Sequence, residues 1–152
     1  MKNEIDRDRS TVAFQRQLSS PPDDVFDAWT RPERVTQWWD PSGEPLTACA
    51  IDLRVGGAFR FETAGHAPPF VGTYSVVERP HRLEFEAMGA HGTVSLRAEG
   101  GGTRMDVTIA SPSPEHFETF LKLGVDVGTG KTLDQLVAHV ARRHPHVAEA
   151  AR

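Results

Sequence analysis

The chain has 152 residues, about the size of one domain with a single core, and 38% of them are hydrophobic and 25% charged. The formal net charge of −4, with no basic stripe interleaved with aromatic residues, argues against a nucleic-acid partner. No apolar run approaches the roughly 18 residues of a membrane span, and residues 1–10 lack the apolar stretch of a secretory signal, so we expect a cytoplasmic protein with no membrane partner.

The first predicted element is a β-strand near the start of the chain. Residues 1–152 are expected to form one domain with an ordered core over about 10–142 and flexible ends, because residues 1–9 are mostly charged or polar. Arg16 interrupts an otherwise apolar face of this strand. The apolar residues of that face are Val12, Phe14 and Leu18.

Two short helices are predicted next. Residues 19–24, SSPPDD, combine capping hydroxyls, prolines suited to a first helical turn, and acids favoured at a helix N-terminus. Thr30 and Glu33 match a capping box, so a second helix is expected to begin there. The predicted buried residues of the two helices are Val25, Phe26, Trp29, Val35, Trp38 and Trp39.

Six short strands are predicted between about Leu46 and Ala110, where the apolar period changes to two. The clearest connection is Gly56-Gly57, which is predicted to form a two-residue hairpin turn because such turns need positive φ. Short connections between consecutive strands indicate an antiparallel meander with one polar face. The predicted inward residues are Cys49, Ile51, Leu53, Phe59, Phe61, Val71, Thr73 or Tyr74, Leu83, Phe85, Val94, Leu96, Met105, Val107 and Ile109.

A C-terminal helix is predicted to cover the apolar face of this sheet. Ser113 is the expected N-cap and Pro114 the first helical residue. Glycines interrupt the helical pattern at Gly124, Gly128 and Gly130, each costing about 1 kcal/mol relative to alanine, so a bend or break is expected there. The apolar residues at helical spacing are Phe117, Phe120, Leu121, Val125, Leu133, Leu136, Val137 and Val140.

Residues 128–132, GTGKT, resemble a phosphate-binding loop only superficially. That motif needs four residues between its glycines, whereas five separate Gly130 from Gly124. It also needs a strand before the loop, but the preceding segment has helical spacing. Nucleotide hydrolysis is therefore disfavoured.

Reactive and metal-binding patterns are weak. No histidine pair shows the i, i+4 spacing with a glutamate that zincins need, and the last three histidines, at 139, 144 and 146, are expected in a solvated tail. Cys49 is expected to be a small buried residue because its neighbours are Ala48, Ala50 and Ile51. A catalytic thiol is disfavoured, since no histidine lies nearby in sequence to lower its pKa. Asp52 and Arg54 are expected to form an exposed structural ion pair. We therefore predict no metal, no cofactor and no catalytic residue.

The order of these elements resembles the helix-grip fold of the START-like, or SRPBCC, superfamily, in the branch related to the heat-shock-protein-90 ATPase activator (AHSA-like). The matching segments are residues 22–30 with Pro32-Glu33, Trp38-Trp39, residues 52–57, Gly72 with Tyr74, residues 101–105 and residues 128–136. The resemblance implies an α+β fold in which a curved antiparallel sheet of about seven strands wraps around a long C-terminal helix. Thr129 departs from the family pattern, which usually has tryptophan there; either a neighbouring side chain compensates or the cavity is roomier.

Helix-grip folds commonly leave a hollow between the sheet and the long helix, so the resemblance implies binding of a small apolar molecule there. For any one residue, an ordinary core position is the alternative. His66, Tyr74 or Asp126 could orient a polar group of the ligand. The predicted ligand-binding residues are Trp38, Trp39, Phe59, Phe61, His66, Phe70, Tyr74, Phe85, Phe117, Phe120, Leu121 and Gly124.

Two other functions stay open at this point. The resemblance also implies a chaperone-interacting module of the heat-shock-protein-90 ATPase activator type, or a cyclase- or aromatase-like enzyme that uses the same cavity. An enzyme is less favoured than a binding protein, because no titratable residue is marked as lying inside the hollow. The identity of the ligand and the formation of a homodimer are not determined by the sequence.

Overall fold

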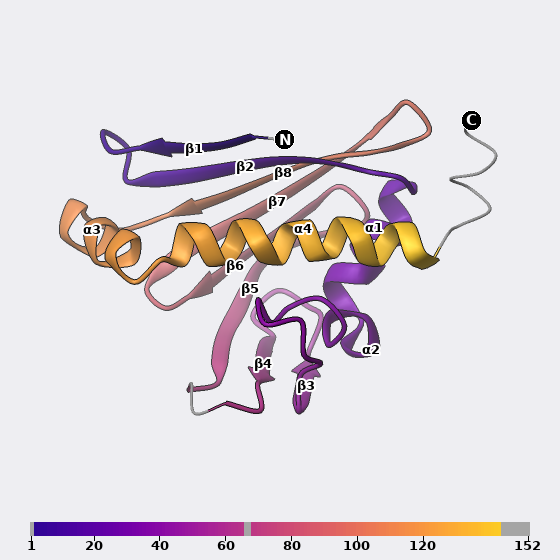
Figure 1. Ribbon diagram of the computed structural model, residues 1–152, viewed down its shortest axis with the longest axis horizontal. Coiled ribbons are helices and arrows are strands. Elements are labelled where there is room, and N and C mark those ends of the chain that lie inside the picture. Colours follow the sequence, from indigo (N-terminus) through magenta and orange to yellow (C-terminus); the bar gives the residue numbers. More distant parts are fainter. Residues whose placement is uncertain (1, 66–67, 144–152) are drawn as a thin grey trace.

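The computed structural model describes residues 2–65 and 68–143. Over these residues, eight antiparallel strands form a sheet in the order β1-β2-β8-β7-β6-β5-β4-β3, which curves around helix α4 (Figure 1). The predicted α+β helix-grip fold is confirmed, with one strand more than the seven expected.

None of the helices within the described residues combines the length and the apolar character that crossing a bilayer requires.

The elements follow the predicted chain order. The strands are β1 (Lys2–Asp6), β2 (Thr11–Leu18), β3 (Ala48–Ile51), β4 (Ala58–Glu62), β5 (Phe70–Glu78), β6 (Arg82–Ala87), β7 (Ala90–Glu99) and β8 (Gly102–Ala110). The helices are α1 (Pro22–Thr30), α2 (Pro32–Val35), α3 (Pro114–Lys122) and α4 (Val125–Arg143).

The additional strand, β1, lies in the N-terminal segment, where the sequence pattern predicted no strand. β1 pairs antiparallel with β2, with Glu4 opposite Ala13 and Ile5 opposite Val12. Residues 3–9 are exposed. Because neither face of this strand is buried, its sequence lacks the alternation of apolar and polar residues by which the other strands were predicted. The charged residues that suggested disorder instead suit a sheet edge, where they discourage pairing with another chain.

The connection between β3 and β4 is a loop over residues 52–57, not the predicted two-residue hairpin. Gly56 has a φ of +82°, as a turn glycine would, but its N–H donates to the carbonyl of Tyr74 on β5 at 2.8 Å. Leu53 is 38% exposed, so its predicted inward orientation is wrong. The loop backbone pairs with a strand distant in sequence, and no local pattern reveals that.

The register of β4 with β5 decides which side chains of β5 point inward. Phe61 lies opposite Phe70, and Phe59 lies opposite Gly72. Val71 therefore lies on the outer face, where it is 48% exposed, and its predicted inward position is wrong.

The capping of the first two helices also differs from the prediction. α1 ends at Thr30, whose hydroxyl donates to the carbonyl of Phe26 at 2.7 Å. Arg31 is the N-cap of α2, and it provides no side-chain cap. The predicted capping box of Thr30 and Glu33 is therefore wrong, because the Thr30 hydroxyl already bonds within α1.

The C-terminal helical region is broken as predicted. Ser113 caps α3 by accepting a hydrogen bond from the N–H of His116 at 3.1 Å. The break falls at Gly124, which has a φ of +75°. Residues 128–132 lie inside α4, where their backbone groups belong to a helix and not to a phosphate loop.

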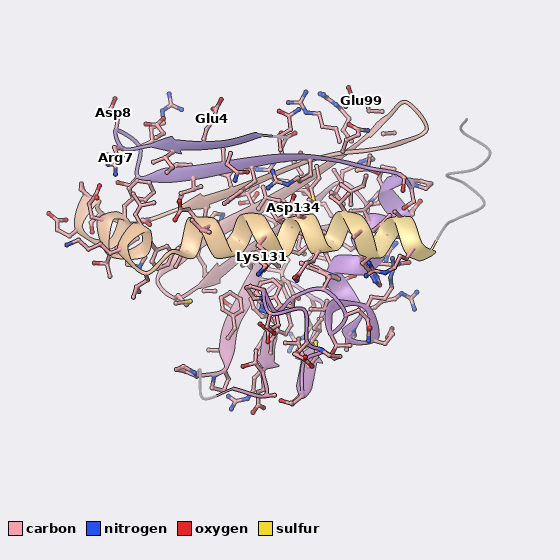
Figure 2. The ribbon with its side chains drawn as sticks, in the orientation of Figure 1. Glu4, Arg7, Asp8, Glu99, Lys131 and Asp134 are labelled. Atoms are coloured by element: carbon pink, nitrogen blue, oxygen red, sulfur yellow. The ribbon has the colours of Figure 1, made fainter. Side chains whose placement is uncertain are left out.

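Helix α4 crosses the concave face of the sheet (Figure 1) and carries Asp134, which is labelled in Figure 2. Arg16 of β2 ties the helix to the sheet. The buried Arg16 donates from Nε to Oδ1 of Asp134 at 2.8 Å and from Nη2 to the carbonyl of Gly130 at 3.3 Å. Gly130 also leaves room for Asn3 of β1, because an added Cβ would lie 3.0 Å from Nδ2 of Asn3. The arginine that interrupts the apolar face of β2 thus fixes the helix to the sheet.

A second buried charge network holds the C-terminal half of α4. Arg34 of α2 donates from Nη1 to Oδ1 of Asp24 at 2.6 Å and from Nε to Nε2 of His139 at 3.2 Å. His139 is 8% exposed, so its expected place in a solvated tail is wrong, while residues 144 and 146 lie outside the described residues. Because an N–H donates to Nε2, that nitrogen of His139 carries no proton.

We expect Arg34→Met to lower the free energy of unfolding by about 3–5 kcal/mol, because Asp24 loses its buried guanidinium partner. Arg54→Met is the matched control, since the Arg54–Asp52 pair is exposed and such pairs contribute about 0–1 kcal/mol. Urea denaturation of both variants measures the two losses. Equal losses would show that the Arg34 network contributes no more than a surface pair.

On the outer face of the sheet, His91 of β7 lies between two carboxylates of β6. Nδ1 of His91 is hydrogen-bonded to Glu86, and Nε2 lies 2.7 Å from Oε1 of Glu84. The bonds to Glu86 and Glu84 raise the pKa of His91. The same contact with His91, together with Arg82, lowers the pKa of Glu84.

These shifts predict a pH-dependent contribution to stability. The pKa of His91 is raised above the value of 6.5 expected for the unfolded chain, so its contribution is complete below about pH 6.5 and is lost as pH rises through the folded-state pKa. The difference in unfolding free energy between the wild type and His91→Gln should therefore be larger at about pH 6 than at about pH 9. Urea denaturation at both values measures it, and a difference independent of pH would contradict the assignment.

Candidate functional site

An apolar pocket of about 260 Å³ lies between the first half of α4 and the concave face of the sheet. Its aromatic lining residues are Trp29, Trp38, Trp39, Phe70, Phe85 and Phe120. Aliphatic and small residues from β6, β7 and β8 form the floor, and the polar side chains of the lining are Thr129 and Thr132 of α4. No lining residue carries a charged side chain.

The pocket exists because α4 carries small residues over this part of the sheet. Gly128 has no side chain, and an added Cβ there would meet no atom closer than Cγ of Pro41 at 4.0 Å. Thr129 adds only a short side chain to the lining. One turn further on, Leu133 is 1% exposed, and the helix closes against the sheet.

Glycines in the strands let two phenylalanine rings pack over the neighbouring strand. Phe85 lies opposite Gly92, and a Cβ on Gly92 would lie 2.5 Å from the Phe85 ring. Phe59 lies opposite Gly72, where a Cβ would lie 2.4 Å from Cζ of the ring. The Phe85 ring thus lies over Gly92, in the space that a side chain at position 92 would take. In this position the ring lines the pocket without filling it.

The three tryptophans form the wall at the α1–α2 end. The Trp38 ring lies 5.0 Å from that of Trp29 and 5.7 Å from that of Trp39, in edge-to-face arrangements. The indole N–H of Trp38 donates to the carbonyl of Ala28 at 3.0 Å, and that of Trp29 contacts the sulfur of Met105 at 3.4 Å. With these N–H groups satisfied inside the protein, Trp29 and Trp38 add apolar surface to the pocket.

The structure brings part of the predicted ligand-binding set to this pocket. The predicted residues that line it are Trp38, Trp39, Phe70, Phe85 and Phe120. Phe59, Phe61 and Tyr74 instead border a hollow of about 10 Å³, too small for a ligand. Their role as ligand contacts stays a prediction, and their observed place is the packed layer behind the pocket.

The other predicted residues lie elsewhere. Phe117 and Leu121 border a second hollow of about 10 Å³, together with Asp126. Gly124 stands at the break between α3 and α4, and His66 lies outside the described residues. Tyr74 and Asp126 therefore do not line the 260 Å³ pocket, where either was expected to orient a polar group.

Sequence reasoning did not select several lining residues, notably Gly92 and Thr132. A glycine inside a strand pattern often marks a close approach, and that signal at Gly92 was available. Thr132 lines the pocket through the helix register and donates its hydroxyl to the carbonyl of Trp39 at 3.1 Å. No pattern within its own segment could indicate that contact.

The reactive groups nearest this region are not activated. Burial, followed by the charge of Glu33, raises the pKa of the Cys49 thiol to about 11. Burial also raises the pKa of Tyr74. Both groups are therefore protonated at neutral pH. Among the described residues, no three His, Cys, Asp or Glu side chains are grouped so that they could hold a metal ion.

An α+β helix-grip sheet with an apolar pocket under its long helix is the architecture of the START-like class. Residues 19–141 match the family described as "Activator of Hsp90 ATPase homolog 1-like protein". The match spans most of the chain, and the protein belongs to this family. No curated protein matches the sequence significantly.

Solved structures of bacterial proteins share the fold. A protein from Nitrosomonas europaea is 22% identical with a TM-score of 0.80, and the alignment covers 89% of this chain and 96% of that one. A protein from Arthrobacter aurescens is 20% identical with a TM-score of 0.84, covering 93% and 92%. A protein from Mycobacterium smegmatis is 20% identical with a TM-score of 0.80, covering 95% and 99%. At these identities the similarity shows the fold alone.

We expect Gly92→Ala to push the Phe85 ring into the pocket, because the new Cβ would lie 2.5 Å from the ring and β7 is held between two other strands. The overpacking should lower the free energy of unfolding by about 1–3 kcal/mol. A crystal structure of the variant measures the displacement of the ring. Gly65→Ala is the control, since a Cβ there meets nothing within 4 Å. A shifted β7 with an unmoved ring would contradict the expectation.

Proposed function

We propose that this protein binds a small, uncharged, largely apolar molecule in the pocket between α4 and the sheet. The observation that carries this proposal is the lining itself, which presents aromatic and aliphatic side chains and no charged one. Its volume of about 260 Å³ lies just below the roughly 300–1,000 Å³ of pockets for drug-sized ligands, which favours a small molecule.

The lining also restricts the polarity of the ligand. An ionised group placed there would lose its hydration without gaining a charged partner, at a large cost in free energy. The Thr132 hydroxyl is already used by the carbonyl of Trp39. The Thr129 hydroxyl has no hydrogen-bond partner among the described residues and is available to a ligand. The occupant we propose is therefore apolar, with one hydroxyl, carbonyl or similar neutral group facing Thr129.

Binding is favoured over catalysis by the chemistry of the lining. General acid–base or nucleophilic catalysis needs a titratable or activated group within reach of the substrate. The lining supplies threonine hydroxyls and apolar side chains, and the thiol of Cys49 lies outside it with a raised pKa. A cyclase- or aromatase-like activity in this pocket would have to rely on the way the pocket shape folds the substrate, without an acid, a base or a nucleophile in the lining.

A chaperone-interacting role is the second candidate, because of the description of the family. The observation that favours it is the loop of residues 52–57, where Leu53 is 38% and Val55 64% exposed. Exposed aliphatic side chains on an ordered loop suit a protein contact. Leu53→Ser combined with Val55→Ser would remove it without altering the pocket, and stimulation of heat-shock-protein-90 ATPase activity would report the effect.

The binding proposal predicts saturable uptake of a neutral fluorescent probe. N-phenyl-1-naphthylamine should gain emission on binding, while its charged relative 1-anilinonaphthalene-8-sulfonate should bind at least about ten-fold more weakly, because the lining offers no cation. Thr129→Trp should reduce binding of the neutral probe by at least about ten-fold, since the indole would fill the pocket.

The control is Val127→Trp, which adds an indole to the same helix at a position that is 72% exposed. It should bind the neutral probe as the wild type does. The melting temperature of each variant confirms that it is folded. Unchanged binding in Thr129→Trp would place the probe elsewhere, and a wild type that binds no neutral probe of a broad panel would refute the proposal.

A further inference from the structure

We propose that Met88, in the turn between β6 and β7, is a ligand-contacting residue whose side chain covers the occupant of the pocket, at the expense of turn stability. This inference rests on the proposed binding function. It begins from the backbone at position 88, where φ is +54°, a value that residues other than glycine rarely adopt.

The β6–β7 turn has the geometry of a two-residue hairpin connection. Ala87 pairs with Ala90, and both central residues have positive φ, +54° at Met88 and +77° at Gly89. Turns with two positive φ values favour Asn, Asp or Gly at the first central position. Methionine is unfavourable for the backbone conformation of this turn, so local structure does not explain its presence.

The same chain builds an equivalent turn with favourable residues at a place that does not line the 260 Å³ pocket. Between β7 and β8, Glu99 pairs with Gly102, and Gly100 and Gly101 have φ values of +59° and +82°. A Cβ on Gly100 would meet nothing within 4 Å, so space does not dictate glycine there. Of these two equivalent turns, the one that lines the pocket has methionine at its first central position, and the other has glycine.

Helix α3 holds the β6–β7 turn in place at the pocket. Nε2 of His116 lies 2.9 Å from the carbonyl oxygen of Met88 and donates to it. A Cβ on Gly89 would lie 3.0 Å from the same nitrogen, and the φ of +77° also favours glycine at this position. The His116 ring also lies 4.4 Å from that of Phe120, which lines the pocket.

The side chain of Met88 both lines the pocket and remains 56% exposed. It therefore buries little apolar surface in the fold itself, and an occupant of the pocket would supply the missing contact. A methionine side chain has three rotatable bonds and a polarisable sulfur, so it can adapt to the shape of a ligand. We expect it to fold over the bound molecule and to slow its dissociation.

Three variants test this role, with N-phenyl-1-naphthylamine as the probe. Met88→Asn should raise the melting temperature by about 2–4 °C, because it suits the turn, and should weaken probe binding about ten-fold, mainly through faster dissociation. Met88→Leu should keep binding within about three-fold without the gain in melting temperature. Gly100→Met should lower the melting temperature by a similar amount and leave binding unchanged.

The outcomes separate this inference from the binding proposal. If the wild type binds the probe and Thr129→Trp blocks it, but Met88→Asn binds as tightly as the wild type, the role of Met88 is wrong and the pocket stands. If Gly100→Met, in a turn whose residues do not line the pocket, weakens binding as much as Met88→Asn does, the loss is not specific to position 88 and the role is equally wrong. A wild type that binds no neutral probe overturns both proposals.

Discussion

Helix α4 is the longest helix over the concave face of the sheet, so the size of its side chains strongly affects where the interior beneath it is filled. Leu133, Leu136 and Val140 are at most 1% exposed and close the interior along the second half of the helix. At Gly128 and Thr129 the helix offers little volume, and the sheet below remains partly uncovered. The pocket is thus the direct consequence of where the helix is thin.

The helix cannot move toward the sheet to close this gap, because charged side chains fix its position. Arg16 holds Asp134 from one side, and Arg34 holds His139 from another. Both guanidinium groups are buried, and separating a buried charge from its partner costs about 3–5 kcal/mol. Close packing usually removes voids, so rigid anchors on the helix are what allow this one to persist.

Local signals predicted the elements well where each depends on its own residues. The Ser113 cap and the break at Gly124 follow from residues that act within one or two turns. The sequence was misleading where the structure depends on distant partners. The loop over residues 52–57 uses its glycines to reach Tyr74, and β1 is a strand only because β2 pairs with it.

The same limit applies to the candidate site. An aromatic cluster was predictable from composition and spacing, but the side chains that face the pocket depend on sheet register and depth. Phe61 and Phe70 lie opposite each other in neighbouring strands, yet Phe70 borders the pocket and Phe61 lies in the packed layer behind it. No pattern within either strand distinguishes them.

Residues that local stability would not select gather around the pocket. Gly92 interrupts a strand, Met88 adopts a positive φ, and Thr129 leaves a helix position underfilled. The outer face of the sheet shows the opposite pattern, since His91 there has carboxylate partners on the adjacent strand. Proteins tolerate locally unfavourable choices mainly where function requires them. Because three such choices, from a strand, a turn and a helix, meet at one pocket, the concave side is where the observations that support the binding proposal converge.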